Sequence, residues 1–126
     1  MQLKSFEDLA GQVLSNVENK DDEQLIFTLA TGEKYRLYHE QDCCEQVTIE
    51  DIVGDLSDLV GSPILMAEEA TNANNENPEG VPQKLYQESF TWTFYKLATV
   101  KGYVTGRWYG ESNGYYSESV DWGEAY

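Results

Sequence analysis

The sequence predicts a single α+β domain, built mostly from an antiparallel β-sheet with one or two helices packed against it. Several segments alternate apolar and polar residues, as half-buried strands do, and one segment repeats its apolar residues at helical spacing. The length of 126 residues supports one hydrophobic core, so we expect one domain over residues 1–126.

The first forty residues are predicted to form a short helical turn and three strands. Ser5 is a suitable N-cap for a turn over residues 5–9, because its hydroxyl can accept a bond from a backbone N–H of that turn. Residues 12–17 and 24–30 are apolar or alternating and flank a polar turn, so they predict a hairpin. Residues 33–39 follow a second turn as the third strand of a meander.

The clearest helix is predicted to begin at Thr48, whose side chain can cap the first turn. Gly61 and Pro63 then mark its end. The apolar residues at helical spacing are Ile49, Ile52, Val53, Leu56, Leu59 and Val60. Residues 64–67 are expected to form the strand that follows.

The C-terminal part predicts long strands with two distinct faces. Residues 90–95 alternate strictly, so they present one face of large aromatic side chains. The residues of that face are Phe90, Trp92 and Phe94. In the next strand Val104 and Trp108 continue an apolar face, while polar and aromatic residues fill the opposite one.

Two segments rich in turn-forming residues connect these strands. Residues 70–83 have no periodicity and hold several Asn, Pro and Gly residues, so we expect an exposed loop. Asn113 and Gly114 favour a tight hairpin turn into a last strand over residues 115–122.

The charge disfavours bulk nucleic acid as a partner. The chain has 23 acidic and 8 basic residues, a formal charge of −15, so it is poorly suited to neutralise phosphates along DNA or RNA. No apolar run approaches the roughly 20 residues of a membrane helix, and the first residues lack the order of a signal peptide. Cys43 and Cys44 are adjacent and not expected to pair with each other. We therefore expect a cytoplasmic protein that binds neither nucleic acid nor membrane.

Acidic and aromatic residues occupy different parts of the chain. Residues 1–80 hold four basic and 18 acidic residues, whereas residues 81–126 hold four basic and five acidic ones. The second part also carries 12 of the 16 Phe, Tyr and Trp residues. An anionic or planar ligand therefore meets less repulsion and more stacking surface there.

One C-terminal strand predicts a ligand site. Lys101, Tyr103 and Arg107 share a face, so an ammonium, a ring and a guanidinium can converge on a phosphate and a stacked base. Arg107 is the residue that we expect to hold the phosphate. Aromatic strands also form cores and dimer interfaces, and that alternative stays open. The candidate ligand-binding residues are Arg107, Trp108, Tyr109, Lys101, Tyr103, Asn113, Tyr115 and Arg36.

The sequence holds only weak indications of an enzyme or a metalloprotein. His39 with Cys43 and Cys44 lacks the spacing and the second ligand pair of a zinc site. Three carboxylates would share a face of the predicted helix, as a Mg²⁺-dependent hydrolase needs, although an exposed acidic face is the commoner explanation. They are Asp51, Asp55 and Asp58. The chain also has no glycine-rich phosphate loop, so we expect no catalytic residue, metal or cofactor.

Three segments carry a family resemblance over the chain from about Gly32 onward. They are YHEQDCCE at 38–45, IEDIVGDL with LVGSPIL between 49 and 65, and RWYGESNGYYS at 107–117. Together they resemble a family of small bacteriophage and prophage proteins, similar to the anti-defence proteins that sequester the cyclic ADP-ribose signal of the bacterial Thoeris system. The resemblance implies a sponge that binds without cleaving, in the cytoplasm of a bacterial host. It also implies homodimers that assemble towards hexamers, and in some members a separate site for cyclic oligonucleotides.

Other functions and the assembly remain open at this point. One alternative is an acidic inhibitor that binds a protein or mimics DNA, and another is a metal-dependent nucleotide hydrolase. A hydrolase turns its ligand over, whereas a sponge returns it intact after denaturation. We expect a homodimer, because one helix is too small to cover the apolar face of the predicted sheet.

Overall fold

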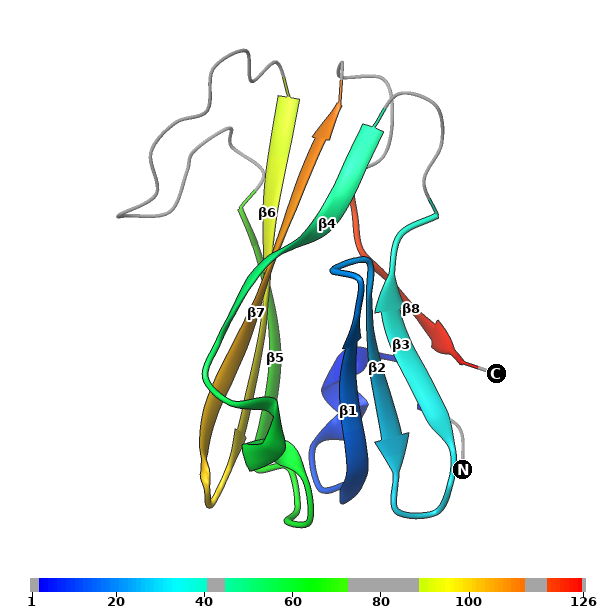
Figure 1. The fold of residues 1–126 in the computed structure, drawn as a ribbon, viewed down its shortest axis with the longest axis vertical. Helices are drawn as coiled ribbons and strands as arrows, with labels where there is room; N and C mark the ends of the chain where they lie inside the picture. The colour runs from blue at the N-terminus through cyan, green and yellow to red at the C-terminus, as the bar shows by residue number, and fades with distance from the viewer. Residues whose placement is uncertain (1–2, 41–44, 73–88, 113–117, 126) are drawn as a thin grey trace.

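The computed structural model consists of two four-stranded antiparallel sheets packed face to face (Figure 1). It describes residues 3–40, 45–72, 89–112 and 118–125. The strands are β1 (Leu14–Lys20), β2 (Gln24–Leu29), β3 (Lys34–Tyr38), β4 (Glu45–Val53), β5 (Met66–Asn72), β6 (Ser89–Thr99), β7 (Gly102–Ser112) and β8 (Asp121–Glu124). The mostly antiparallel architecture is therefore confirmed.

The packed helices of the prediction are wrong. Within the described residues the only helical elements are two short 3₁₀ turns, η1 (Phe6–Leu9) and η2 (Leu56–Leu59). The short turn predicted after Ser5 is η1, in which Asp8 accepts the backbone N–H of Ser5. No helix of the described chain has the length and apolar character needed to span a membrane.

The first sheet has the strand order β1-β2-β3-β8. Its first three strands form the predicted meander, because each turns directly into the next. The fourth strand, β8, comes from far along the chain and pairs with β3. The predicted last strand over 115–122 is shifted, since residues 118–120 are not in a strand and pairing begins at Asp121. Asn113 and Gly114 lie outside the described residues.

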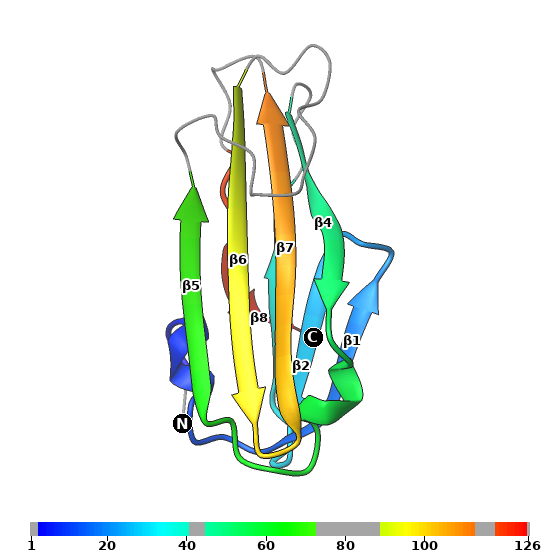
Figure 2. The same ribbon diagram turned by 90° about the vertical axis from the view of Figure 1, so that its left-hand side faces the viewer.

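The second sheet has the order β4-β7-β6-β5, with the two longest strands, β6 and β7, at its centre (Figure 2). Its edge strand β5 begins two residues after the predicted start at position 64. It also includes residues 70–72, which were expected to open the loop over 70–83. The rest of that loop lies outside the described residues.

The predicted helix after Thr48 is instead β4 followed by η2. In β4 the pairing with β7 shifts by one residue between Ile49 and Asp51, so Glu50 is the extra residue of a bulge. The bulge turns both Ile49 and Ile52 towards the other sheet, three positions apart. Because this segment consists of a strand with a bulge and a 3₁₀ turn, its apolar residues recur at helical spacing although it forms no α-helix. Thr48 is therefore a mid-strand residue and caps no helix.

The main core lies between the two sheets. Leu25, Phe27 and Leu37 of the first sheet face Tyr95, Leu97 and Trp108 of the second. The turn η1 adds Phe6 and Leu9, and Trp122 of β8 stacks on Tyr35 with 5.3 Å between ring centroids. Each sheet thus covers the apolar face of the other. The homodimer stays a prediction.

A second, smaller cluster lies on the outer face of the second sheet. It contains Phe90, Trp92 and Tyr109, with Phe94 packed against them. The predicted common face of Phe90, Trp92 and Phe94 is therefore confirmed. The alternate residue Tyr95 points the other way, into the main core.

Candidate functional site

The predicted ligand-binding residues lie in several separate places. Trp108 is in the core, whereas Tyr103, Arg107 and Tyr109 are on the outer face of the second sheet. Lys101 is in the turn between β6 and β7, and Arg36 is on the outer face of the first sheet. Asn113 and Tyr115 lie outside the described residues. The structure therefore does not bring the basic residues of the prediction together.

Arg107 forms an ion pair with Asp51, its direct neighbour across β4 and β7. Its Nε donates to Oδ1 at 2.6 Å, and its Nη2 donates to Oδ2. The hydrogen bonds raise the pKa of Arg107 and lower that of Asp51. A two-point contact of this kind uses the same donor fork that would hold a phosphate. A phosphate at Arg107 would therefore have to displace a carboxylate.

Lys101 and Tyr103 do not extend a phosphate site around Arg107. The Lys101 ammonium donates to the carbonyl oxygen of Val60 at 2.6 Å, at the end of the sandwich. Tyr103 is 75% exposed and lies on the same face as Arg107. Four residues of strand separate the two, which corresponds to roughly 13 Å.

Trp108 and Tyr109 point to opposite faces of β7, and both are buried. Trp108 is 1% exposed in the main core. The Tyr109 ring packs against Trp92 at 4.8 Å, and its hydroxyl donates to Glu111 at 3.1 Å. Neither ring forms a solvent-facing platform for a base. This part of the chain favours the alternative in which aromatic strands form a core.

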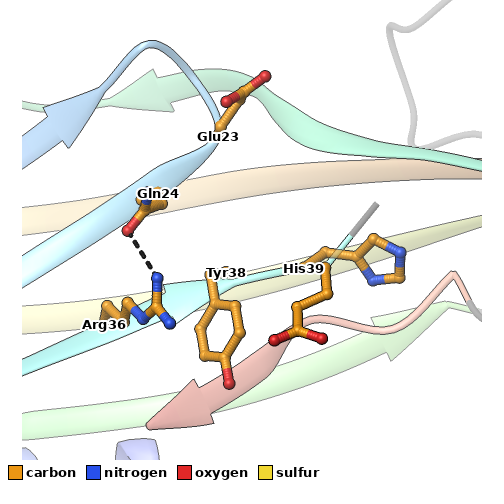
Figure 3. Close-up of a pocket in the computed structure, with 6 residues that line it drawn as sticks. Glu23, Gln24, Arg36, Tyr38 and His39 are labelled. Atoms are coloured by element: carbon orange, nitrogen blue, oxygen red, sulfur yellow. Dashed lines mark hydrogen bonds between the residues drawn. The ribbon is translucent and has the colours of Figure 1, made fainter. Parts of the chain in front are cut away.

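A hollow of about 170 Å³ lies on the outer face of the first sheet (Figure 3). Because Tyr35 and Leu37 point into the core, the alternating residues Arg36 and Tyr38 point outwards. Gln24 faces Tyr38 across β2 and β3. The residues that line the hollow are Glu23, Gln24, Arg36, Tyr38, His39 and Glu40.

Arg36 is held in a fixed orientation on the wall of this hollow. Its guanidinium carbon lies 3.9 Å from the centroid of the Tyr38 ring, and its Nη1 donates to Gln24 Oε1 at 3.1 Å. Its Nε is buried and has no hydrogen-bond partner in the described part of the chain. The guanidinium carries five N–H donors, so this arginine keeps donor capacity that Arg107 spends on Asp51.

His39 closes one side of the hollow. Its Nδ1 lies 2.7 Å from the carbonyl oxygen of Ser119, and its Nε2 lies 3.0 Å from Glu45 Oε1. Both neighbours are oxygen acceptors, so the ring donates to both at once only as an imidazolium. The contacts join the end of β3, the start of β4 and the segment before β8. His39 therefore fixes the wall of the hollow.

The three carboxylates of the hydrolase hypothesis do not form a cluster in the structure. Asp51 is paired with Arg107, and Asp55 caps η2 by accepting the Ser57 backbone N–H at 2.9 Å. That hydrogen bond and a second one from the Ser57 hydroxyl lower the pKa of Asp55. Without the predicted helix these groups share no face. Among the described residues no three His, Cys, Asp or Glu side chains form a group fit for a metal, and Cys43 and Cys44 lie outside that part.

A second hollow, of about 150 Å³, lies between β4 and β7 on the other sheet. The residues that line it are Gln46, Thr48, Glu50, Tyr109 and Glu111. Two carboxylates and no cationic side chain contribute to this lining. The second hollow therefore suits an anionic ligand less well than the hollow at Arg36.

Arg36 was among the predicted site residues, but the other residues that line its hollow were not. Arg36 and Tyr38 are separated by one buried residue in a predicted strand, and this alternation could have placed them on one outward face. The contribution of Gln24 depends on the register between β2 and β3, which the sequence pattern does not give.

Comparisons with known proteins identify a family to which the chain belongs. No curated protein and no solved structure matches the chain significantly. A family model, described as a domain of unknown function (DUF7448), matches residues 7–122. The match covers strands β1 to β7, the start of β8 and the hollow at Arg36. The chain belongs to the DUF7448 family.

Proposed function

We propose that the protein is a binding protein that sequesters a phosphorylated nucleotide ligand of the cyclic ADP-ribose type, without cleaving it, in the hollow at Arg36. The observation that carries this proposal is the state of the Arg36 guanidinium. It is oriented by Gln24 and the Tyr38 ring, and it retains N–H donors without a carboxylate partner in the described chain. An oriented guanidinium is the group best suited to two-point recognition of a phosphate.

The other groups of the hollow suit the sugar and the base. Glu23 and Glu40 are exposed at the hollow, and carboxylates commonly accept hydrogen bonds from ribose hydroxyls. The guanidinium of Arg36 is planar, and a base can stack on such a plane. Phosphate, ribose and base thus each have a chemical partner here.

The size of the hollow limits how the ligand is held. About 170 Å³ is below the roughly 300–1,000 Å³ of sites that enclose a small molecule. The hollow has room for part of a nucleotide, so the rest of the ligand would lie across its rim.

The net charge of −15 opposes the approach of an anion. At about 0.15 M salt the screening length is about 8 Å, so this repulsion is confined to charges near the site. The closest such charges are the two carboxylates of the hollow.

The test measures binding of cyclic ADP-ribose isomers by calorimetry to the wild type, Arg36→Ala and the matched control Arg107→Ala. Loss of a charge-assisted contact should weaken binding by Arg36→Ala about 10- to 150-fold. Arg107→Ala should bind like the wild type, because its guanidinium serves Asp51. Heat denaturation and chromatography of the released ligand should then return it intact.

Four outcomes contradict the proposal. The wild type fails to bind any of these isomers, Arg36→Ala binds them as tightly as the wild type, the released ligand is cleaved, or Arg107→Ala alone loses binding while it stays folded. The last outcome would return the site to the second sheet.

A further inference from the structure

A glycine of the C-terminal strand lies directly beside the arginine of the hollow. Gly123 of β8 pairs with Arg36 of β3, and the next pair on the same face joins Tyr38 to Asp121. Gly123 and Tyr38 are therefore diagonal neighbours. Figure 3 shows the Tyr38 side chain lying toward β8, whereas the Arg36 guanidinium lies toward Gln24 of β2. The two side chains of β3 thus lean in opposite directions across the sheet.

The Tyr38 ring occupies the space that a side chain at position 123 would need. A Cβ added to Gly123 would lie 3.4 Å from Cε1, 3.5 Å from Oη and 3.9 Å from Cζ of Tyr38. All three of the nearest atoms thus belong to this one residue. A Cβ alone would be in ordinary van der Waals contact, but a longer side chain would compete with the ring for its place.

The backbone does not itself require glycine at position 123. Gly123 is not among the glycines with positive φ in the described chain. It lies inside β8 (Asp121–Glu124), and a strand interior favours β-branched and aromatic residues over glycine. The room that it leaves for the Tyr38 ring therefore explains why a side chain is missing here.

The place of the ring determines the orientation of the guanidinium. The Arg36 guanidinium carbon lies 3.9 Å from the centroid of the Tyr38 ring, so the ring supports its face. Gln24 holds one edge through Nη1 at 3.1 Å. If the ring moves, the guanidinium keeps only this second contact within the described chain and can turn about it.

We propose that Gly123 is a positioning residue of the ligand site. It leaves room for the Tyr38 ring, and the ring holds the Arg36 guanidinium in the orientation that binds a phosphate. The effect on affinity rests on the proposed function, whereas the effect on the arginine is measurable without a ligand. Strand β8 provides none of the residues that line the hollow, and it contributes to the site through Tyr38.

The first measurement follows the Arg36 side chain by NMR. The chain has two arginines, Arg36 and Arg107, so arginine labelled with nitrogen-15 gives two Nε–H signals, which Arg107→Ala assigns. An aromatic ring shifts the signals of groups that lie over its face. In Gly123→Ile the Arg36 signal should therefore move as it does in Tyr38→Ala, while the Arg107 signal stays in place.

The second measurement is the affinity for cyclic ADP-ribose isomers by calorimetry. Gly123→Ile should weaken binding about 3- to 10-fold, as for loss of one cation–π contact between half-buried groups. Gly123→Val, with a smaller side chain, is measured beside it, so that the result does not depend on one variant. Isoleucine and valine are favourable in a strand, and thermal melts check that both variants stay folded.

Two further variants show whether the effect passes through the ring. Gly123→Ile/Tyr38→Ala should bind as Tyr38→Ala does, because the isoleucine has no ring to displace. Thr28→Ile adds a similar side chain to the same outer face, where Thr28 pairs with Lys34. It should bind like the wild type.

The two measurements separate this inference from the proposed function. An Arg36 signal that stays in place in both Gly123 variants overturns the inference. It is also overturned by a moved signal with wild-type affinity, by a double variant that binds more weakly than Tyr38→Ala, or by equal weakening in Thr28→Ile. A wild type that binds no isomer contradicts the proposed function, and a moved Arg36 signal would then still support the placement of Arg36 by Gly123.

Discussion

The two sheets each carry one arginine on an outward-facing strand position, and the two have different surroundings. Arg107 lies opposite Asp51 and spends its donor fork on that carboxylate. Arg36 lies beside Tyr38 and Gln24, a ring and a neutral amide, in a hollow. The side chains next to each arginine on its own and the adjacent strands decide which guanidinium is a structural ion pair and which can recognise a ligand.

The largest effect is expected from Gly54→Ala, which removes the ion pair by moving the strand that carries it. Gly54 has φ +104, and a Cβ there would lie 2.4 Å from the Tyr103 carbonyl oxygen. Strain and clash together should cost about 3 kcal/mol of unfolding free energy. Denaturant melts measure this cost.

Gly32→Ala is the matched control in the first sheet. Its φ is similar at +99, but no atom lies within 4 Å of the added Cβ. It should cost only about 1 kcal/mol. Equal costs for the two variants would mean that contact with Tyr103 is unimportant and that β4 is not held as described.

A smaller effect is expected from double-mutant cycles on the two arginines. Asp51→Asn with Arg107→Gln should give a coupling energy of about 1 kcal/mol, modest because the two side chains are 42% and 25% exposed. Gln24→Ala with Arg36→Gln should give about half of that, because only one partner is charged. A larger coupling for the second pair would reverse the assignment of structural and ligand-binding arginine.

Acid should abolish the first coupling. The hydrogen bond from Arg107 lowers the pKa of Asp51 from its ordinary value of 3.8. A lowered pKa in the folded state means that the stabilisation is complete above the unfolded value and is lost as pH falls through the folded value. The stability difference between wild type and Asp51→Asn should therefore shrink as the pH falls below the ordinary pKa of 3.8 and through the lowered pKa of the folded state. A difference that is constant over this range would exclude the ionised pair.

The smallest effect is expected from Thr48→Val. If Thr48 were a helix N-cap, this substitution would lower the unfolding free energy of the protein by about 1 kcal/mol. In the middle of β4, opposite Tyr109, valine is as favourable as threonine. We expect a change within about 0.5 kcal/mol by thermal or denaturant melt, and a loss of 1 kcal/mol or more would favour the cap.

Local patterns were sufficient for the elements built from neighbouring residues. The meander of β1 to β3, the turn η1 and the alternation in β6 were all predicted from periods of two residues or from a capping side chain. The helix after Thr48 was wrong because one extra residue, Glu50, changes the period of a strand. A bulge depends on the partner strand, which the sequence window does not include.

The site was only partly predictable for the same reason. Asp51 and Arg107 are 56 positions apart, so nothing near Arg107 in the sequence reveals that a carboxylate opposes it. Arg36 was among the predicted residues, but its orientation by Gln24 follows from strand register. Strand register depends on the tertiary structure, and it determines both the pairing of Arg107 with Asp51 and the contact of Arg36 with Gln24.

The position of β8 has a consequence for how the chain folds. The first three strands of its sheet occur before residue 40, and the fourth occurs only after all four strands of the other sheet. Trp122 then reaches back to donate to the carbonyl of Leu3 at 3.2 Å. Contacts between such distant positions form late and slowly, because a long loop must close first. The meander of β1 to β3 is therefore expected to form first, as a sheet that lacks β8. We expect both sheets to reach their final stability together, in one cooperative step.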